Sequence, residues 1–100
     1  MTVTLNHAYF APLLGQTFAI EMEGAAAVAL VLKHNTKRET APSGYESFSL
    51  IFDGPVSPLL NQATYRLAHE RAGSHDIFLV PVAGDEQGHQ YEASFTIKTD

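Results

Sequence analysis

The sequence predicts a single all-β domain over residues 1–100, mainly antiparallel, in the form of a small six-stranded partly open barrel or sandwich with a short N-terminal helix. Three observations predict this class. Apolar side chains recur at every second position in several short segments, turn-forming residues stand between most of them, and 100 residues suit one domain. A partly open barrel is preferred because closure removes exposed strand edges.

The composition provides enough apolar material for one core. The 45% of hydrophobic residues include 13 alanines, which leaves 32 larger apolar side chains. The chain contains no cysteine, so disulfides, thiolate metal sites and cysteine nucleophiles are excluded. We therefore expect a fold that needs neither crosslinks nor a structural metal.

The N-terminal segment favours a short helix. Asn6 is a suitable N-cap, and the residues after it form a turn or two before Pro12, whose ring disfavours helical geometry at Ala11. Gly15 can adopt the positive φ that closes such a segment.

Six segments are predicted strands: 17–23, 25–32, 47–52, 64–69, 76–82 and 91–98. The last alternates most cleanly, and glycines at 84 and 88 predict that a hairpin loop joins it to the preceding strand. Residues 77–82 are apolar on both faces, so we expect the barrel interior to cover one face and the N-terminal helix the other. Pro81 lacks an N–H donor and is expected at an edge or a bulge.

Two connections have a polar or proline-led sequence. Residues 33–46 form the least hydrophobic stretch and are expected to be a mobile loop. Pro58, Leu59 and Leu60 are expected to form a single turn of helix, with proline at its start.

Charge and hydropathy exclude several classes of partner. The net charge of −5, from 11 acidic and 6 basic residues, argues against a nucleic-acid binder. The longest apolar stretch, residues 24–32, is too short to span a membrane, and the N-terminus lacks the pattern of a signal peptide. We therefore expect a soluble, cytoplasmic protein with no nucleic-acid or membrane partner. The basic residues of the 33–46 loop, Lys33, Lys37 and Arg38, are the candidate partner-binding residues.

No constellation of catalytic residues stands out, and no cofactor or metal is expected. In an extended chain, His75 points away from Ser74 and Asp76, so these neighbours do not form a hydrolytic relay. The alternative is a small metal-dependent binder or hydrolase centred on His69 and His75, which flank one turn, with Glu70 or Asp76 as a third ligand. Against it, ligands on one flexible turn are poorly held, and Arg71 adds an opposing charge.

Segments 5–18, 48–55, 58–67 and 78–82 together resemble a family of small bacterial single-domain proteins without an assigned biochemical function. The resemblance covers nearly the whole chain, but its motifs are structural and carry over no active-site residue. It implies an accessory or assembly role in the company of phage-tail collar and tail-fibre type proteins.

These observations predict a non-enzymatic binding or assembly module whose partner is another protein or a second copy of the chain. The expected contact surfaces are the basic loop and any strand edge left without a partner. A binder of small ligands inside the barrel would need a cavity that the larger apolar side chains are expected to fill.

Overall fold

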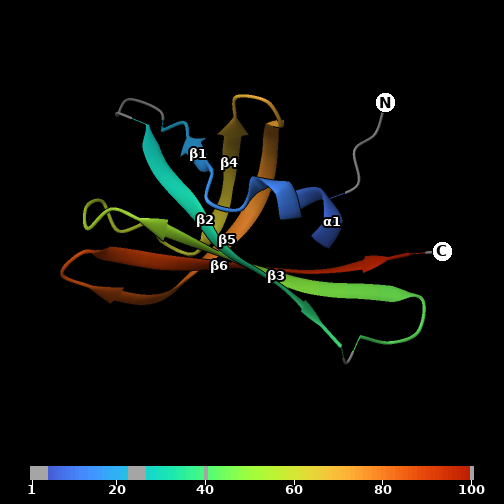
Figure 1. The fold of residues 1–100 in the computed structure, drawn as a ribbon. Helices are drawn as coiled ribbons and strands as arrows, with labels where there is room; N and C mark the ends of the chain where they lie inside the picture. The colour runs from blue at the N-terminus through green and yellow to red at the C-terminus, as the bar shows by residue number, and fades with distance from the viewer. Residues whose placement is uncertain (1–4, 23–26, 40, 100) are drawn as a thin grey trace.

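The computed structural model describes residues 5–22, 27–39 and 41–99 and confirms the predicted fold class. One short α-helix and one 3-10 turn precede six antiparallel strands (Figure 1). The elements are α1 (His7–Phe10), η1 (Ala11–Leu13), β1 (Thr17–Ile20), β2 (Val28–Arg38), β3 (Tyr45–Gly54), β4 (Ala63–His69), β5 (Gly73–Asp85) and β6 (Gly88–Lys98). Residues 23, 25 and 26 of the predicted strands lie outside the described residues.

The six strands close into a ring in the order β1-β2-β3-β6-β5-β4. The ring is irregular, because β1 and β4 meet through only the pairs Ala19–Ala68 and Ile20–Leu67. In addition, β5 pairs with β6 only from Val80 to Asp85, and its earlier residues, 73–79, pair with β4 alone. Consequently the second half of β2, the first half of β3 and the last half of β6 extend together to one side of the ring, while β1, β4 and the first half of β5 extend to another (Figure 1).

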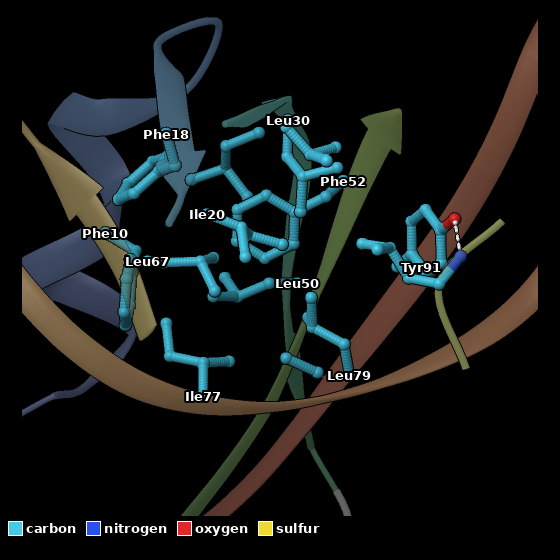
Figure 2. Packing of buried hydrophobic residues seen from close by; sticks show 14 of the residues in the cluster. Phe10, Phe18, Ile20, Leu30, Leu50, Phe52, Leu67, Ile77, Leu79 and Tyr91 are labelled. Carbon is cyan, nitrogen blue, oxygen red and sulfur yellow. Dashed lines mark hydrogen bonds between the residues drawn. The ribbon is translucent and has the colours of Figure 1, made fainter. Parts of the chain in front are cut away.

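The interior of the ring is filled by side chains from every strand. Buried and exposed residues alternate along the strands, as expected for a sheet with one apolar face. Phe18 and Phe52, both part of the cluster in Figure 2, pack edge to face with 5.6 Å between their ring centroids. The buried cluster consists of Phe10, Phe18, Ile20, Val28, Leu30, Leu32, Phe48, Leu50, Phe52, Leu60, Leu67, Ile77, Leu79, Tyr91 and Ala93.

The N-terminal segment folds as predicted. The Asn6 side chain accepts a hydrogen bond from the backbone N–H of Tyr9 at 2.8 Å, which caps α1. The helix gives way to the 3-10 turn η1 at Ala11, directly before Pro12, and Gly15 has a φ of 79°. The segment therefore lies against the sheet, with Phe10 in the core.

The prediction of a loop over residues 33–46 is wrong at both ends, because β2 continues to Arg38 and β3 begins at Tyr45. Lys33–Arg38 continue β2, and this part pairs with β3 from His34–Ile51 to Arg38–Ser47. A bulge between Leu32 and His34 shifts the register and marks where the apolar part of β2 ends and the polar part begins. Cross-strand pairing thus maintains the strand where the local sequence is polar.

Two smaller expectations are also wrong. Phe78 and Val82 are 50% and 49% exposed, so β5 is not covered on both faces. The helix packs instead against the rings of Phe48 and Phe95, on strands β3 and β6. Pro58, Leu59 and Leu60 form no helix, and the backbone N–H of Leu60 donates a hydrogen bond to the Tyr91 hydroxyl.

The C-terminal hairpin is confirmed. β5 and β6 pair from Val80–Glu92 to Asp85–Gly88, so the connection is tighter than the predicted loop. The register shifts between Pro81 and Ala83, which places Pro81 at a bulge as predicted. Within the described ranges, no helix is long and apolar enough to cross a membrane.

Candidate functional site

The most distinctive surface is the part of the sheet that projects beyond the ring, which we call the arm. It consists of Lys33–Arg38 of β2, Tyr45–Leu50 of β3 and Ala93–Lys98 of β6. β3 is the central strand: residues 45–50 all pair with β6, and residues 47–50 also pair with β2. The arm is thus a three-stranded antiparallel sheet with two outer strands, one basic and one nearly uncharged.

The inner face of the arm is covered by α1. Phe48 and Phe95 are directly paired across β3 and β6, and their rings stack with centroids 4.7 Å apart. Phe10 lies over both rings, at centroid distances of 6.1 Å and 6.0 Å. This aromatic group fixes the helix on the arm.

Polar contacts reinforce this attachment. A carboxylate oxygen of Glu46 accepts a hydrogen bond from the backbone N–H of His7 at 2.9 Å, and the other lies 3.4 Å from Lys37 Nζ. The hydrogen bond from His7 and the nearby Lys37 charge lower the pKa of Glu46 below its ordinary value, despite the opposing effect of burial. Asn35 Nδ2 donates to the His7 carbonyl at 2.9 Å. The helix is therefore held to the arm at its first residue.

The two outer strands of the arm have no second strand partner among the residues that the structure describes. Pairing of β1 with β2 ends at Thr17–Val31, and two further backbone bonds join Leu32 to Gly15 and Gln16. On the other side, β5 leaves β6 after Glu92. Lys33–Arg38 and Ala93–Lys98 therefore present one unpaired edge each.

The structure places the predicted partner-binding residues on the first of these edges. Lys33 Nζ lies 3.8 Å from Asp53, Lys37 Nζ lies 3.4 Å from Glu46, and Arg38 donates to the Ser94 hydroxyl at 3.3 Å. All three side chains remain exposed. They are part of a regular strand rather than a loop, so their spacing is fixed.

His69 is held in a different environment from His75. Its Nδ1 accepts hydrogen bonds from the backbone N–H groups of Arg71 and Ala72, both at 3.1 Å. Its Nε2 lies 2.9 Å from Gln16 Oε1 and donates to it, since Nδ1 is the acceptor. With a residue exposure of 6% and both nitrogens bonded, His69 organises the β4–β5 turn.

His75 contacts the N-terminal helix instead. Its Nε2 lies 2.9 Å from the Tyr9 hydroxyl, and both atoms lie 3.1 Å from the carbonyl oxygen of Ala72. Asp76 faces Arg66, at 3.3 Å, and not the imidazole. His75 also pairs with Leu67 rather than with His69 in the hairpin. In the described part of the chain, no three His, Cys, Asp or Glu residues are grouped as metal ligands.

Two hollows lie away from the arm. One, of about 380 Å³, is lined by polar residues of the β5–β6 hairpin and the end of β3, including Asp53, Asp85 and His89. The carboxylates there are already engaged, Asp53 by Gln90 and Asp85 by the backbone N–H groups of its own turn. The other is a shallow groove of about 600 Å³ between Tyr9, Leu13 and Arg71.

Sequence reasoning found the three cations and expected any unpaired strand edge to be a contact surface, but it did not show which strand edges are unpaired. The clean alternation of residues 91–98 predicted the strand β6. Alternation alone does not show which side of a strand is paired. The roles of Glu46 and His69 depend on residues far along the chain, and no local pattern indicates them.

The fold and the arm define a small antiparallel β domain whose conspicuous features are exposed strand edges. The chain belongs to a family described as a domain of unknown function (DUF6916), whose model matches residues 5–95. The resemblance to a family of unassigned function is therefore confirmed. Neither the curated proteins nor the solved structures contain a match to this chain.

Proposed function

We propose that this chain is a non-enzymatic binding or assembly module that receives an extended segment of another protein along the basic edge of the arm. The observation that supports this most directly is the unpaired edge of Lys33–Arg38, a regular strand with a partner on one side only. Strand addition at such an edge supplies main-chain hydrogen bonds for affinity and side-chain contacts for specificity.

The charge of the edge strand indicates which class of partner segment can pair with it. The edge strand carries Lys33, Lys37 and Arg38, all exposed, while the chain as a whole has a net charge of −5. Lysines on an edge strand discourage pairing with another basic or neutral strand. An extended segment with acidic side chains at alternate positions offsets that charge, so we propose an acidic strand as the occupant.

The resemblance described above suggests where to look for this partner. It associates the family with phage-tail collar and tail-fibre type proteins, so an accessory role in a phage-tail-like assembly is our first proposal for the biological setting. The metal-dependent alternative receives no support from the geometry, because His69 and His75 are bonded to different groups.

The test begins with the products of the genes that neighbour this one, purified individually. Each is mixed with the chain, and complex formation is measured by size-exclusion chromatography with light scattering. Hydrogen exchange then maps the complex, and we expect new protection in residues 33–38. The double variant Lys33→Glu, Arg38→Glu should abolish binding.

The matched control is the double variant Arg66→Glu, Arg71→Glu, which makes the same change of charge on β4 and the β4–β5 turn. It should bind normally. Equal loss of binding in both variants would mean that net charge alone is responsible. Protection confined to residues outside 33–38 would contradict the proposed edge.

A further inference from the structure

We infer that the second edge of the arm, Ala93–Lys98 of β6, pairs antiparallel with the same edge of a second copy of this chain. This goes beyond the proposed function, which concerns the edge of β2 and a different protein. The pairing joins two arms into one continuous sheet in the order β2-β3-β6-β6-β3-β2. Three observations support the inference: the composition of the β6 edge, the register that this edge allows, and the basic strand β2 at the opposite edge of each arm.

The composition of this edge lacks the features that prevent pairing. Residues 93–98 contain no proline, no glycine and no charge before Lys98, and they include the strand-favouring residues Phe95, Thr96 and Ile97. The backbone is a regular strand up to Lys98, paired with β3 along its whole length. By contrast, the β2 edge carries three cations in six residues. Of the two edges, only that of β6 is suited to pairing with an identical strand.

The geometry of the sheet restricts the register. In a two-fold antiparallel pair, each inward residue lies opposite another inward residue, so odd positions pair with odd positions. A pair centred on Phe95 would place Lys98 of the partner subunit beside Glu92, where Val80 already pairs. A pair centred on Thr96 avoids this overlap, because it extends only from Ser94 to Lys98.

The register centred on Thr96 also matches the side chains. On the inner face, Phe95 lies opposite Ile97 of the partner subunit, and by symmetry the same contact occurs twice. Both side chains are only half-buried in the single chain, so pairing covers apolar surface that is now exposed. On the outer face, the exposed Thr96 lies opposite Thr96 of the partner subunit.

The basic strand limits the size of the assembly. In the joined sheet, the outermost strands are the two copies of Lys33–Arg38, and like charges oppose further pairing between these edges. The contact is isologous and uses the same patch on both copies, so it closes at two. The inferred assembly is therefore a dimer and not a fibre.

A reciprocal pair of charge variants tests both the partner and the register. Thr96→Lys and Thr96→Glu each place like charges directly opposite each other, which should weaken the dimer about fivefold or more. An equimolar mixture should recover the dimer, because lysine then faces glutamate. Sedimentation velocity over a range of concentrations measures each case. Thr64→Lys and Thr64→Glu, at an exposed position on β4, are the controls and should dimerise as the natural chain does.

A second measurement does not depend on weakening the contact. The chain has no cysteine, so a Thr96→Cys variant has one thiol, and the opposed Cα atoms of such a pair suit a disulfide. It should form a covalent dimer rapidly under mild oxidation, whereas a Thr64→Cys variant should not. Circular dichroism confirms that each variant is folded.

The inference is overturned if the natural chain stays monomeric at millimolar concentration, or if Thr96→Cys crosslinks no faster than Thr64→Cys. Protection of residues 93–98 that appears only after another protein is added would also overturn it. The Lys33→Glu, Arg38→Glu variant should still dimerise, so the failure of this inference and the failure of the proposed function are observed separately.

Discussion

The buried hydroxyl of Tyr91 accepts a hydrogen bond from the backbone N–H of Leu60, with 3.0 Å between the two atoms (Figure 2). Both residues are almost completely buried, with exposures of 0% and 3%, so this N–H has no access to solvent. The bond ties the irregular connection between β3 and β4 to the middle of β6. It explains why a tyrosine stands in an otherwise apolar cluster.

Tyr91→Phe removes this acceptor and leaves a buried N–H without a partner. We expect the free energy of unfolding to fall by about 1–3 kcal/mol. Chemical denaturation at neutral pH measures the change. Tyr65→Phe is the control, because the Tyr65 hydroxyl donates to the Asn61 carbonyl at an exposed site where water can replace it. A smaller loss in Tyr91→Phe than in Tyr65→Phe would contradict the role of the buried bond.

His69→Leu tests whether this histidine supports the turn or a metal. The substitution leaves the N–H groups of Arg71 and Ala72 without their acceptor, so we expect a loss of about 1–3 kcal/mol. The loss should be the same with a chelator or with added zinc, as measured by thermal unfolding. A loss that appears only when zinc is present would support the metal-dependent alternative instead.

The attachment of α1 to the arm should depend on pH through the carboxylate of Glu46. Its pKa in the folded chain is lowered from 4.5, so its contribution to stability is present above that pH and is lost as the pH falls through the lower folded value. Glu46→Gln lacks the charge at every pH. We therefore expect the natural chain to be the more stable of the two at pH 7, with a difference that shrinks below about pH 4.5.

Urea unfolding of both proteins between pH 3 and pH 7 measures this difference. Asp76→Asn serves as the control, because Asp76 forms an exposed pair with Arg66 that should contribute little at any pH. A difference between the natural chain and Glu46→Gln that stays constant down to pH 3 would show that the charge of Glu46 does not hold the helix.

Gly88 occupies a position that no other residue fits. Its φ is 156°, and a Cβ there would collide with the carbonyl oxygen of Gly54. We expect Gly88→Ala to lower the free energy of unfolding by about 2–4 kcal/mol, from the backbone conformation and the collision together. Gly73→Ala separates the two effects, because Gly73 has a φ of 80° and open space around it. It should cost only about 1–2 kcal/mol, and equal losses would contradict the role of the collision.

The sequence predicted the fold class through local patterns. The alternation of residues 91–98 and the glycines of the last hairpin depend on neighbours in the chain, and both were confirmed. The continuation of β2 through Lys33–Arg38 was missed, because those polar residues are held by pairing with β3 across a bulge. The position of α1 over Phe48 and Phe95, rather than over residues 77–82 of β5, likewise follows from contacts between distant segments.

The sequence predicted which types of residue belong to the candidate site, but not how they are arranged in space. Lys33, Lys37 and Arg38 were recognised as a basic group, but their arrangement along an unpaired edge depends on where β1 stops pairing with β2. His69 and His75 were correctly placed beside one turn, but their ring partners, Gln16 and Tyr9, lie far away in sequence. Partners this far apart along the chain cannot be predicted from a local sequence pattern.

The ladder between β3 and β6, which runs from Tyr45–Lys98 to Gly54–His89, has a consequence for the folding rate. It joins strands separated by two others along the chain, so a long loop must close before any of its hydrogen bonds form. During synthesis, β3 emerges from the ribosome well before β6 and has no access to this ladder in the interval. We therefore expect slow folding, with the native sheet completed only after the last strand has been translated.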